Sequence, residues 1–183
     1  MNFLKTPIEG LWVIEPNIFE DKRGYFFESY NKQKFAEAGL EYNFIQDNQS
    51  LSQKNVVRAL HYQLAPYSQA KLIRVLRGKV LDVAVDLRKK SPTYGRHYSI
   101  ELSSENNLHF LIPRGFAHGF SVLSDDTVLF YKCDNPYMKQ AERGIFFNDP
   151  ALGIDWKINH RDAVISEKDA VLPNFAKAEK NFE

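Results

Sequence analysis

The chain has 183 residues, which suits one domain, and it carries 24 basic and 23 acidic side chains with no block of like charge. We therefore expect no nucleic-acid partner and no membrane-surface binding. A single cysteine, Cys133, excludes an intrachain disulfide and suits a reducing, cytoplasmic location. Acidic residues and prolines interrupt the apolar N-terminus, which argues against a signal peptide and a membrane span.

Short strand-like runs dominate the chain, and several alternate apolar with polar residues. In order, they are Leu11–Glu15, Gly24–Tyr30, Asn55–Gln63, Ala70–Leu76, Lys79–Asp86, Tyr98–Leu102, Leu108–Ile112, His118–Leu123 and Val128–Cys133. In the run 79–86, three apolar residues share one face while Asp82, Ala84 and Asp86 share the other. Turn residues such as Arg77-Gly78 separate the runs, so the pattern predicts an all-β sandwich or barrel.

Only two short helices are predicted. Lys32–Ala38 ends at Gly39, which suits a C-terminal cap, and Glu167–Ala170 follows Ser166 as a candidate N-cap. No repeat or linker marks a second domain, so we expect one domain over residues 1–183, with the barrel core at about 45–135. Residues 174–183 are polar, and we expect this tail to be frayed.

Polar side chains inside apolar strands are informative, because burying them unpaired costs free energy. Lys71, His118 and Tyr131 each lie in such a setting. Arg58 and His61 share one strand but fall on opposite faces of ideal geometry, so both reach one cavity only if the strand is bulged or strongly twisted. Each of these residues has a structural alternative: a hydrogen-bonded core histidine or tyrosine, or a surface arginine or lysine.

Together these residues supply a base, an acid and a cation, a set that suits proton transfer beside a carbonyl group. The sequence has no phosphate-binding glycine loop, dinucleotide fingerprint or nucleophile elbow. It also lacks paired histidines and cysteine clusters with metal-ligand spacing. A metal site made by His61, His118 and a carboxylate is an alternative that the spacing disfavours. We therefore expect no dedicated metal site.

Eight segments resemble, in order and spacing, the dTDP-4-dehydrorhamnose 3,5-epimerases from about residue 5 to about residue 173. They are FEDKRGYFFESY (Phe19–Tyr30), FIQDNQS (Phe44–Ser50), VVRALHYQ (Val56–Gln63), QAKLIRVLRGKVLDVAVDLRKKSPTYG (Gln69–Gly95), IPRGFAHGF (Ile112–Phe120), YKCDNPY (Tyr131–Tyr137), FNDPALGIDW (Phe147–Trp156) and SEKD (Ser166–Asp169). The resemblance implies a cupin-like jelly-roll barrel and a homodimer that needs no metal or cofactor.

The resemblance also implies roles for individual residues. His61 resembles the general base, Asp169 its carboxylate partner, Tyr131 the acid, and Lys71 the cation beside the C4 oxygen of the substrate. Substrate binding is implied for Arg23, Glu28, Gln46, Asp47, Asn48, Arg58, His118, Glu142 and Lys168. Aromatic walls for the thymine or sugar rings are expected from Phe19, Phe26 and Tyr137.

The implied reaction acts on a dTDP-4-keto-6-deoxy sugar. It converts dTDP-4-dehydro-6-deoxy-D-glucose to dTDP-4-dehydro-L-rhamnose by inverting C3 and C5, a step of dTDP-L-rhamnose biosynthesis. Alternatives are a monofunctional 3- or 5-epimerase, a 3,4-ketoisomerase, a non-catalytic sugar-binding barrel and a metal-dependent cupin enzyme. The chain departs from the family pattern at Ala59, where glycine is usual, at Gln49, where histidine is common, and at Asn135-Pro136. None of these departures removes a proposed catalytic group.

Overall fold

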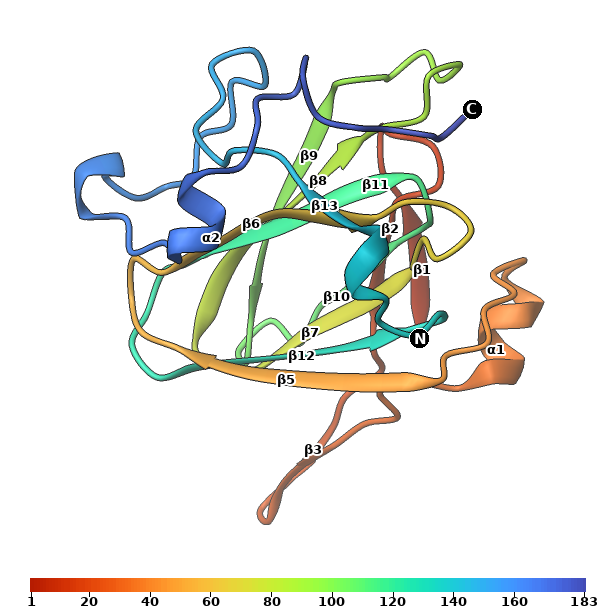
Figure 1. Cartoon of the computed structure of the whole chain (residues 1–183). Coiled ribbons are helices and arrows are strands. Elements are labelled where there is room, and N and C mark those ends of the chain that lie inside the picture. Colours follow the sequence, from red (N-terminus) through yellow and green to blue (C-terminus); the bar gives the residue numbers. More distant parts are fainter.

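Two antiparallel sheets face each other and form the body of the molecule (Figure 1) in the computed structural model, which describes all 183 residues. One sheet has the strand order β1-β2-β10-β7-β12-β5, and the other has the order β13-β6-β11-β8-β9. A separate hairpin pairs β3 with β4. The strands are β1 Asn2–Lys5, β2 Trp12–Glu15, β3 Phe19–Asp21, β4 Gly24–Phe26, β5 Gln46–Ser52, β6 Val57–Gln63, β7 Lys71–Arg77, β8 Lys79–Asp86, β9 His97–Ser103, β10 His109–Ile112, β11 Phe116–Val122, β12 Thr127–Cys133 and β13 Glu142–Gly144.

Three apolar clusters hold this arrangement together. The first fills the space between the two sheets and includes Ile73, Phe110 and Phe120. In the second, the C-terminal segment around Trp156 packs on the outer face of the five-stranded sheet. In the third, helix α1 packs Phe35 on the outer face of the six-stranded sheet. Two facing sheets around one core confirm the predicted all-β, cupin-like jelly-roll barrel with a few short helices.

The nine predicted strands are all present, and Lys79–Asp86 has the predicted bounds. The largest difference is the run Gly24–Tyr30, of which only Gly24–Phe26 is strand, because the chain then turns inward and Tyr30 packs edge-on against Phe35. Four strands were not predicted, namely β1, β3, β5 and β13.

Both predicted helices are confirmed, α1 at Lys32–Glu37 and α2 at Glu167–Ala170, and two short 3₁₀ turns add Lys139–Ala141 and His160–Asp162. Ser166 is the N-cap of α2, since its hydroxyl oxygen accepts a hydrogen bond from the backbone N–H of Asp169 at 3.1 Å. Gly39 follows α1 with a φ of +78°, the left-handed conformation expected after a helix end. None of these helices has the length and apolar character needed to cross a membrane.

The prediction of a frayed tail at 174–183 is wrong. Ala178 and Phe182 are buried in the cluster on the five-stranded sheet. The hydroxyl of Tyr62 donates a hydrogen bond to the backbone carbonyl of Glu179 at 2.6 Å, and the Asn181 side chain exchanges two hydrogen bonds with the backbone of Ala65. Two spaced apolar residues in a polar segment are enough to anchor it, because they complete an existing apolar surface.

Strand β6 contains the bulge that the sequence required. Opposite β11, His61 pairs with His118 and Arg58 with Phe120, so three steps along β6 match two along β11. Gly119 permits this close approach, since a Cβ atom placed there would lie 2.4 Å from that of Ala59. The bulge changes the alternation of side chains, so that Arg58 and His61 both line the barrel interior.

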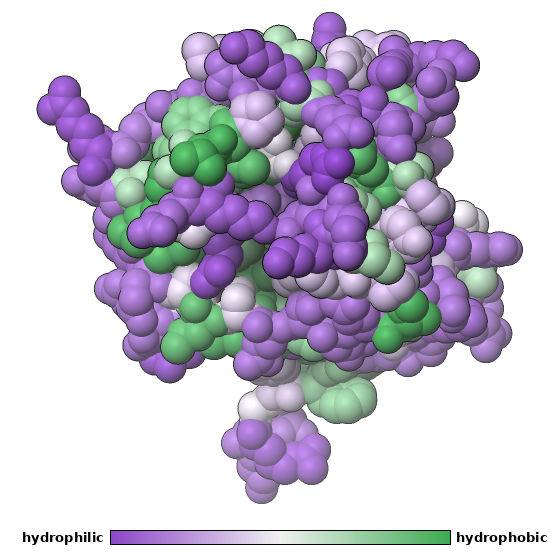
Figure 2. Space-filling view, viewed as in Figure 1, coloured by the Kyte–Doolittle hydropathy of each residue, from purple (hydrophilic) through white to green (hydrophobic).

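The β3–β4 hairpin projects away from the barrel (Figure 1). Its aromatic side chains lie in solvent, with 65% of Phe19, 57% of Tyr25 and 71% of Phe26 exposed. The space-filling view shows the hairpin standing clear of the body, with hydrophobic surface where the two join (Figure 2). A two-stranded hairpin is at best marginally stable alone in water, so these aromatic residues constitute an unpartnered apolar surface within one chain.

Candidate active site

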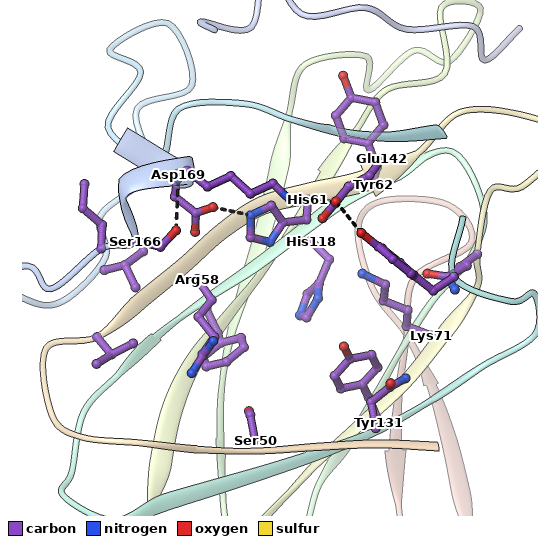
Figure 3. Close-up of a pocket in the computed structure, with 18 of the residues that line it drawn as sticks. Ser50, Arg58, His61, Tyr62, Lys71, His118, Tyr131, Glu142, Ser166 and Asp169 are labelled. Carbon is purple, nitrogen blue, oxygen red and sulfur yellow. Dashed lines mark hydrogen bonds and ion pairs between the residues drawn. The ribbon is translucent and has the colours of Figure 1, made fainter. Parts of the chain in front are cut away.

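A cavity of about 670 Å³ lies between the two sheets. This volume is in the range of small-molecule sites. Strands of both sheets and helix α2 supply its walls, and Figure 3 shows their side chains converging on it. The structure brings together in this cavity the predicted residues His61, Lys71, Tyr131, Asp169, Asn48, Arg58, His118, Glu142 and Lys168.

His61 and Asp169 form a hydrogen-bonded pair at one side of the cavity. The Nε2 atom of His61 lies 2.8 Å from a carboxylate oxygen of Asp169, whose side chain is only 7% exposed. Burial acts to raise the pKa of Asp169, but the hydrogen bond and charge of His61 outweigh it, so the pKa is lowered. An ionised Asp169 only accepts, so His61 Nε2 carries the proton and Nδ1 keeps a free lone pair.

Local structure explains how Asp169 reaches His61 across 108 residues of sequence. Ser166 caps the first turn of α2 and fixes the backbone at Asp169, the third helical residue. With its backbone N–H bonded to Ser166, Asp169 projects its carboxylate from the short helix toward β6 (Figure 3). A histidine held in this way by a carboxylate has the geometry of a general base.

Tyr131 enters the cavity from the opposite sheet. It lies on β12 of the six-stranded sheet, whereas His61 lies on β6 of the five-stranded sheet, and Figure 3 shows the two side chains pointing into the cavity from opposite sides. Burial raises the pKa of Tyr131, so its phenol stays protonated at neutral pH. The arrangement places a proton acceptor and a proton donor on opposite sides of one space.

Lys71 is a cation in the cavity without an ion-pair partner. It lies at the start of β7, its ammonium nitrogen is 5.8 Å from the centre of the Tyr131 ring, and no salt bridge includes it. Burial lowers the pKa of Lys71, while Cys133, then Asp82 and Glu142, act in the other direction. An unpaired buried ammonium group suits a substrate oxygen that gains negative charge.

A second polar group forms one side of the cavity near α2. Glu142 accepts hydrogen bonds from the Tyr137 hydroxyl at 2.8 Å and from the Lys168 ammonium at 2.6 Å. Burial acts to raise the pKa of Glu142, but these two donors outweigh it and the pKa is lowered. Arg58 lines the cavity and is exposed; its Nε donates to the Ser52 hydroxyl at 3.2 Å, which leaves its terminal nitrogens free for an anion.

One buried residue next to the cavity, behind His118, was missed from the sequence. Asp82 is fully buried, and both of its carboxylate oxygens lie 3.0 Å from Nε2 of His118. On β8 the acidic face points into the barrel, while Leu81, Val83 and Val85 pack under the C-terminal segment. The signal was present, since Asp82 interrupts an apolar strand, but strand alternation does not reveal which face is internal.

Four predicted substrate-binding residues do not line the cavity of their own chain. Arg23 lies at the tip of the exposed hairpin and binds Asp21. Glu28 accepts hydrogen bonds from Asn31 and Lys34 beside helix α1. The other two lie on β5. Gln46 accepts a hydrogen bond from the backbone N–H of Tyr137, and Asp47 points outward to Lys132 because β5 alternates its side chains.

The structure has no group of three or more His, Cys, Asp and Glu side chains that could hold a metal ion. Metal-free chemistry nevertheless stays a prediction from the sequence. What the geometry itself provides is a histidine–carboxylate pair, a protonated phenol and a free ammonium group around one cavity.

A family model described as dTDP-4-dehydrorhamnose 3,5-epimerase matches residues 5–177. A dTDP-4-dehydrorhamnose 3,5-epimerase of Shigella flexneri is 47% identical over 180 residues, which cover 98% of each chain. A crystal structure of the corresponding enzyme from Elizabethkingia anophelis has a TM-score of 0.93 and 53% identity, covering 96% of this chain and 97% of that one. The structure of a dTDP-6-deoxy-D-glucose-3,5-epimerase from Legionella pneumophila, in complex with dTDP-4-keto-L-rhamnose, has a TM-score of 0.92 and 45% identity over 96% of this chain and 93% of that one.

Proposed function

This chain belongs to the dTDP-4-dehydrorhamnose 3,5-epimerase family, and we propose that its cavity inverts C3 and C5 of dTDP-4-dehydro-6-deoxy-D-glucose to give dTDP-4-dehydro-L-rhamnose. The protein is thus an isomerase of nucleotide sugars, in dTDP-L-rhamnose biosynthesis. The observation that carries the catalytic assignment is the placement of His61 and Tyr131 on facing sheets. A free thiol at Cys133 suits the cytoplasmic location that we also propose.

The reaction begins with a proton on a carbon next to the C4 ketone. Nδ1 of His61 takes this proton, while Asp169 stabilises the imidazolium that results. The electrons of the broken C–H bond move into an enolate, and its oxygen is stabilised by the Lys71 ammonium. Tyr131 then donates its phenolic proton to the opposite face of the same carbon. Nothing is oxidised or reduced. Proton exchange with solvent then removes the extra proton from His61 and restores the proton of Tyr131.

The remaining cavity residues bind the substrate. Arg58 is the group for diphosphate oxygens, because its guanidinium carries paired donors and Ser52 fixes one end of it. His118 contacts the sugar from the five-stranded sheet, and Asn48 adds an amide from the six-stranded sheet. Glu142 and Lys168 bind the substrate from the side of the cavity nearest α2.

We also propose that the active form is a homodimer in which the β3–β4 hairpin reaches the partner's cavity. The hairpin presents exposed Phe19 and Phe26, and Arg23 lies at its tip. Strand β5, at the edge of the six-stranded sheet, also exposes 58% of Leu51. In such a dimer, Arg23 and Glu28, which do not line the cavity of their own chain, contact the substrate bound in the partner's cavity.

Proton exchange in heavy water tests the function. Purified protein is incubated with dTDP-4-dehydro-6-deoxy-glucose without added metal, and deuterium entry at C3 and C5 is followed by NMR. We expect exchange at both carbons and a product that a rhamnose-forming reductase accepts. Exchange at one carbon would identify a monofunctional epimerase, and migration of the keto group a 3,4-ketoisomerase. Absence of any exchange would contradict the epimerase assignment.

A further inference from the structure

Two carboxylates line the cavity and a third, Asp82, lies behind its wall, and the three differ in their partners. Asp169 is bonded to His61, and Glu142 to the Lys168 ammonium at 2.6 Å. Asp82 is different, because its only side-chain hydrogen-bond donor is His118. Since Asp82 is fully buried and His118 only 6% exposed, water provides little stabilisation for a charge at this position.

His118 does not supply the missing positive charge. Burial lowers the pKa of His118, and the positive charges of Lys71 and His61 act in the same direction, although Asp82 opposes them. The imidazole is therefore neutral at neutral pH, and its Nε2–H donates to Asp82. Its Nδ1 atom forms no hydrogen bond within the chain, so the lone pair of that atom is free to accept one from a sugar hydroxyl.

The cation without a partner is Lys71. The titratable and charged groups around it come from every neighbouring element: Asp82 on β8, His118 on β11, His61 and Arg58 on β6, Tyr131 and Cys133 on β12, Glu142 on β13, and Lys168 and Asp169 on α2. Burial raises the pKa of Cys133 to about 11, so this thiol is uncharged at neutral pH. Glu142 and Asp169 are bonded to cations or to a histidine of their own. Asp82 is bonded only to His118, which lines the same cavity as Lys71, so Asp82 is the buried carboxylate left to balance Lys71.

We propose that Asp82 is a positioning residue of the epimerase site, which holds His118 as its Nε2–H tautomer and keeps the Lys71 ammonium protonated. The proposal rests on the proposed function, because Lys71 is useful to the reaction only as a cation beside the enolate oxygen. Asp82 reaches the substrate through two other side chains. It fixes a hydrogen-bond acceptor that lines the cavity, and it supplies the charge that makes an unpaired buried ammonium group tolerable.

The substitution Asp82→Asn tests the electrostatic part, since it keeps the shape and an acceptor oxygen but removes the charge. The pKa of Lys71 is measured directly by NMR titration of ¹³Cε-labelled lysine, with the Lys71 signal assigned from a Lys71→Arg protein. We expect the pKa of Lys71 to fall by about one unit in the variant. The alkaline limb of the kcat profile should move to lower pH by the same amount, which a merely structural role would not produce.

Asp86→Asn is the matched control. Asp86 lies on the same strand and is also fully buried, but its side-chain partners Arg88, Ser91 and Thr93 do not line the cavity, whereas His118, the partner of Asp82, does. Its loss should lower stability and leave the titration of Lys71 unchanged. The proposal is overturned if Lys71 titrates alike in the wild type and in Asp82→Asn, or if Asp86→Asn shifts it equally.

A measurement on the wild type covers the case in which Asp82→Asn does not fold. ¹⁵N NMR of labelled histidine, with His118 assigned from His118→Gln, should show a neutral Nε2–H tautomer from about pH 6 to about pH 9. An imidazolium or an Nδ1–H tautomer contradicts the proposal. Both NMR readouts are independent of turnover, whereas a wild type without C3 or C5 exchange contradicts the proposed function instead.

Discussion

His61 is the residue on which proton removal depends. We expect His61→Ala to reduce exchange at C3 and C5 by roughly 10²- to 10⁴-fold, the usual contribution of a general base, while the substrate still binds. Deuterium incorporation by NMR and substrate affinity by calorimetry measure the two effects separately. His160→Ala is the control, since His160 lies on the exposed surface. Retained exchange in His61→Ala would assign the base to another group.

Tyr131 determines what happens to the enolate. We expect Tyr131→Phe to slow epimerisation or to divert it to a singly inverted product, because the ring keeps its packing but loses the proton that it donates. Product analysis by NMR detects both effects. Tyr98→Phe serves as the control, since Tyr98 also packs on the barrel core but does not line the cavity. A normal rate and a normal product in Tyr131→Phe would remove the tyrosine from the acid role.

Site residues could be predicted from the sequence where a polar side chain interrupts an apolar strand or where a segment resembles the family. Lys71, His118 and Tyr131 interrupt apolar strands and do line the cavity. Asp82 interrupts a strand in the same way, yet the outward or inward direction of its face depends on what covers β8. The sequence does not indicate that Arg23 lies far from the cavity of its own chain, because the position of the hairpin is a property of the fold.

At the scale of elements, the bulge in β6 controls two functional residues. A Cβ atom at Gly119 would lie 2.4 Å from the Cβ of Ala59, 2.8 Å from its Cα and 2.9 Å from the carbonyl oxygen of Arg58. We expect Gly119→Ala to cost about 1–3 kcal/mol of stability through overpacking, and to lower activity by moving Arg58 and His61. Thermal unfolding and the exchange assay measure these losses.

The substitution Ala59→Gly restores the residue usual in the family and removes only the closest of these contacts. Combined with Gly119→Ala, it should therefore recover part of the lost stability, since the two backbone contacts remain. Wild-type stability in Gly119→Ala alone would show that the bulge accommodates a side chain, contrary to this expectation.

His109 on β10 makes stability depend on pH. It is 1% exposed, neither ring nitrogen has a hydrogen-bond partner, and burial, followed by the charge of Arg74, lowers its pKa to about 3. As the pH falls through about 6.5, the unfolded chain takes up a proton that the folded chain does not. Stability should therefore be complete above that pH, decline as the pH falls toward about 3, and change no further below it through this residue.

His109→Leu removes both unpaired nitrogens. We expect it to raise stability by about 1–3 kcal/mol near neutral pH and to flatten the acid decline, as followed by urea unfolding at several pH values. An unchanged acid decline would show that other groups cause it, and the surface variant His160→Ala should leave the decline as it is.

The elements that could be predicted are those whose two faces differ. Strand β8 alternates and was found with its bounds, whereas β5 (QDNQSLS) is polar on both faces, so alternation gave no signal. Asn48 and Ser50 of β5 line the cavity, and Asp47 pairs with Lys132 on the outer face. A strand that has a binding site on one face and a charged surface on the other shows no alternation of apolar and polar residues, so it cannot be recognised from the sequence pattern.

At the scale of the whole molecule, the hairpin should hold two copies together. We expect the double variant Phe19→Ser and Phe26→Ser to weaken self-association, because it removes the apolar surface that the hairpin exposes. Sedimentation velocity over a range of concentrations measures the change. Tyr67→Ser is the control, since Tyr67 is 38% exposed but lies outside the hairpin. Unchanged association in the double variant would place the interface elsewhere.

The projecting hairpin has a genetic consequence. If each cavity is completed by the Arg23 of the other chain, a chain with His61→Ala and a chain with Arg23→Ala are both inactive for different reasons. In a mixed dimer, one cavity combines the intact His61 of one chain with the intact Arg23 of the other. Co-expression of the two defective alleles should therefore restore about a quarter of wild-type activity, because about half of the dimers are mixed and each has one complete site.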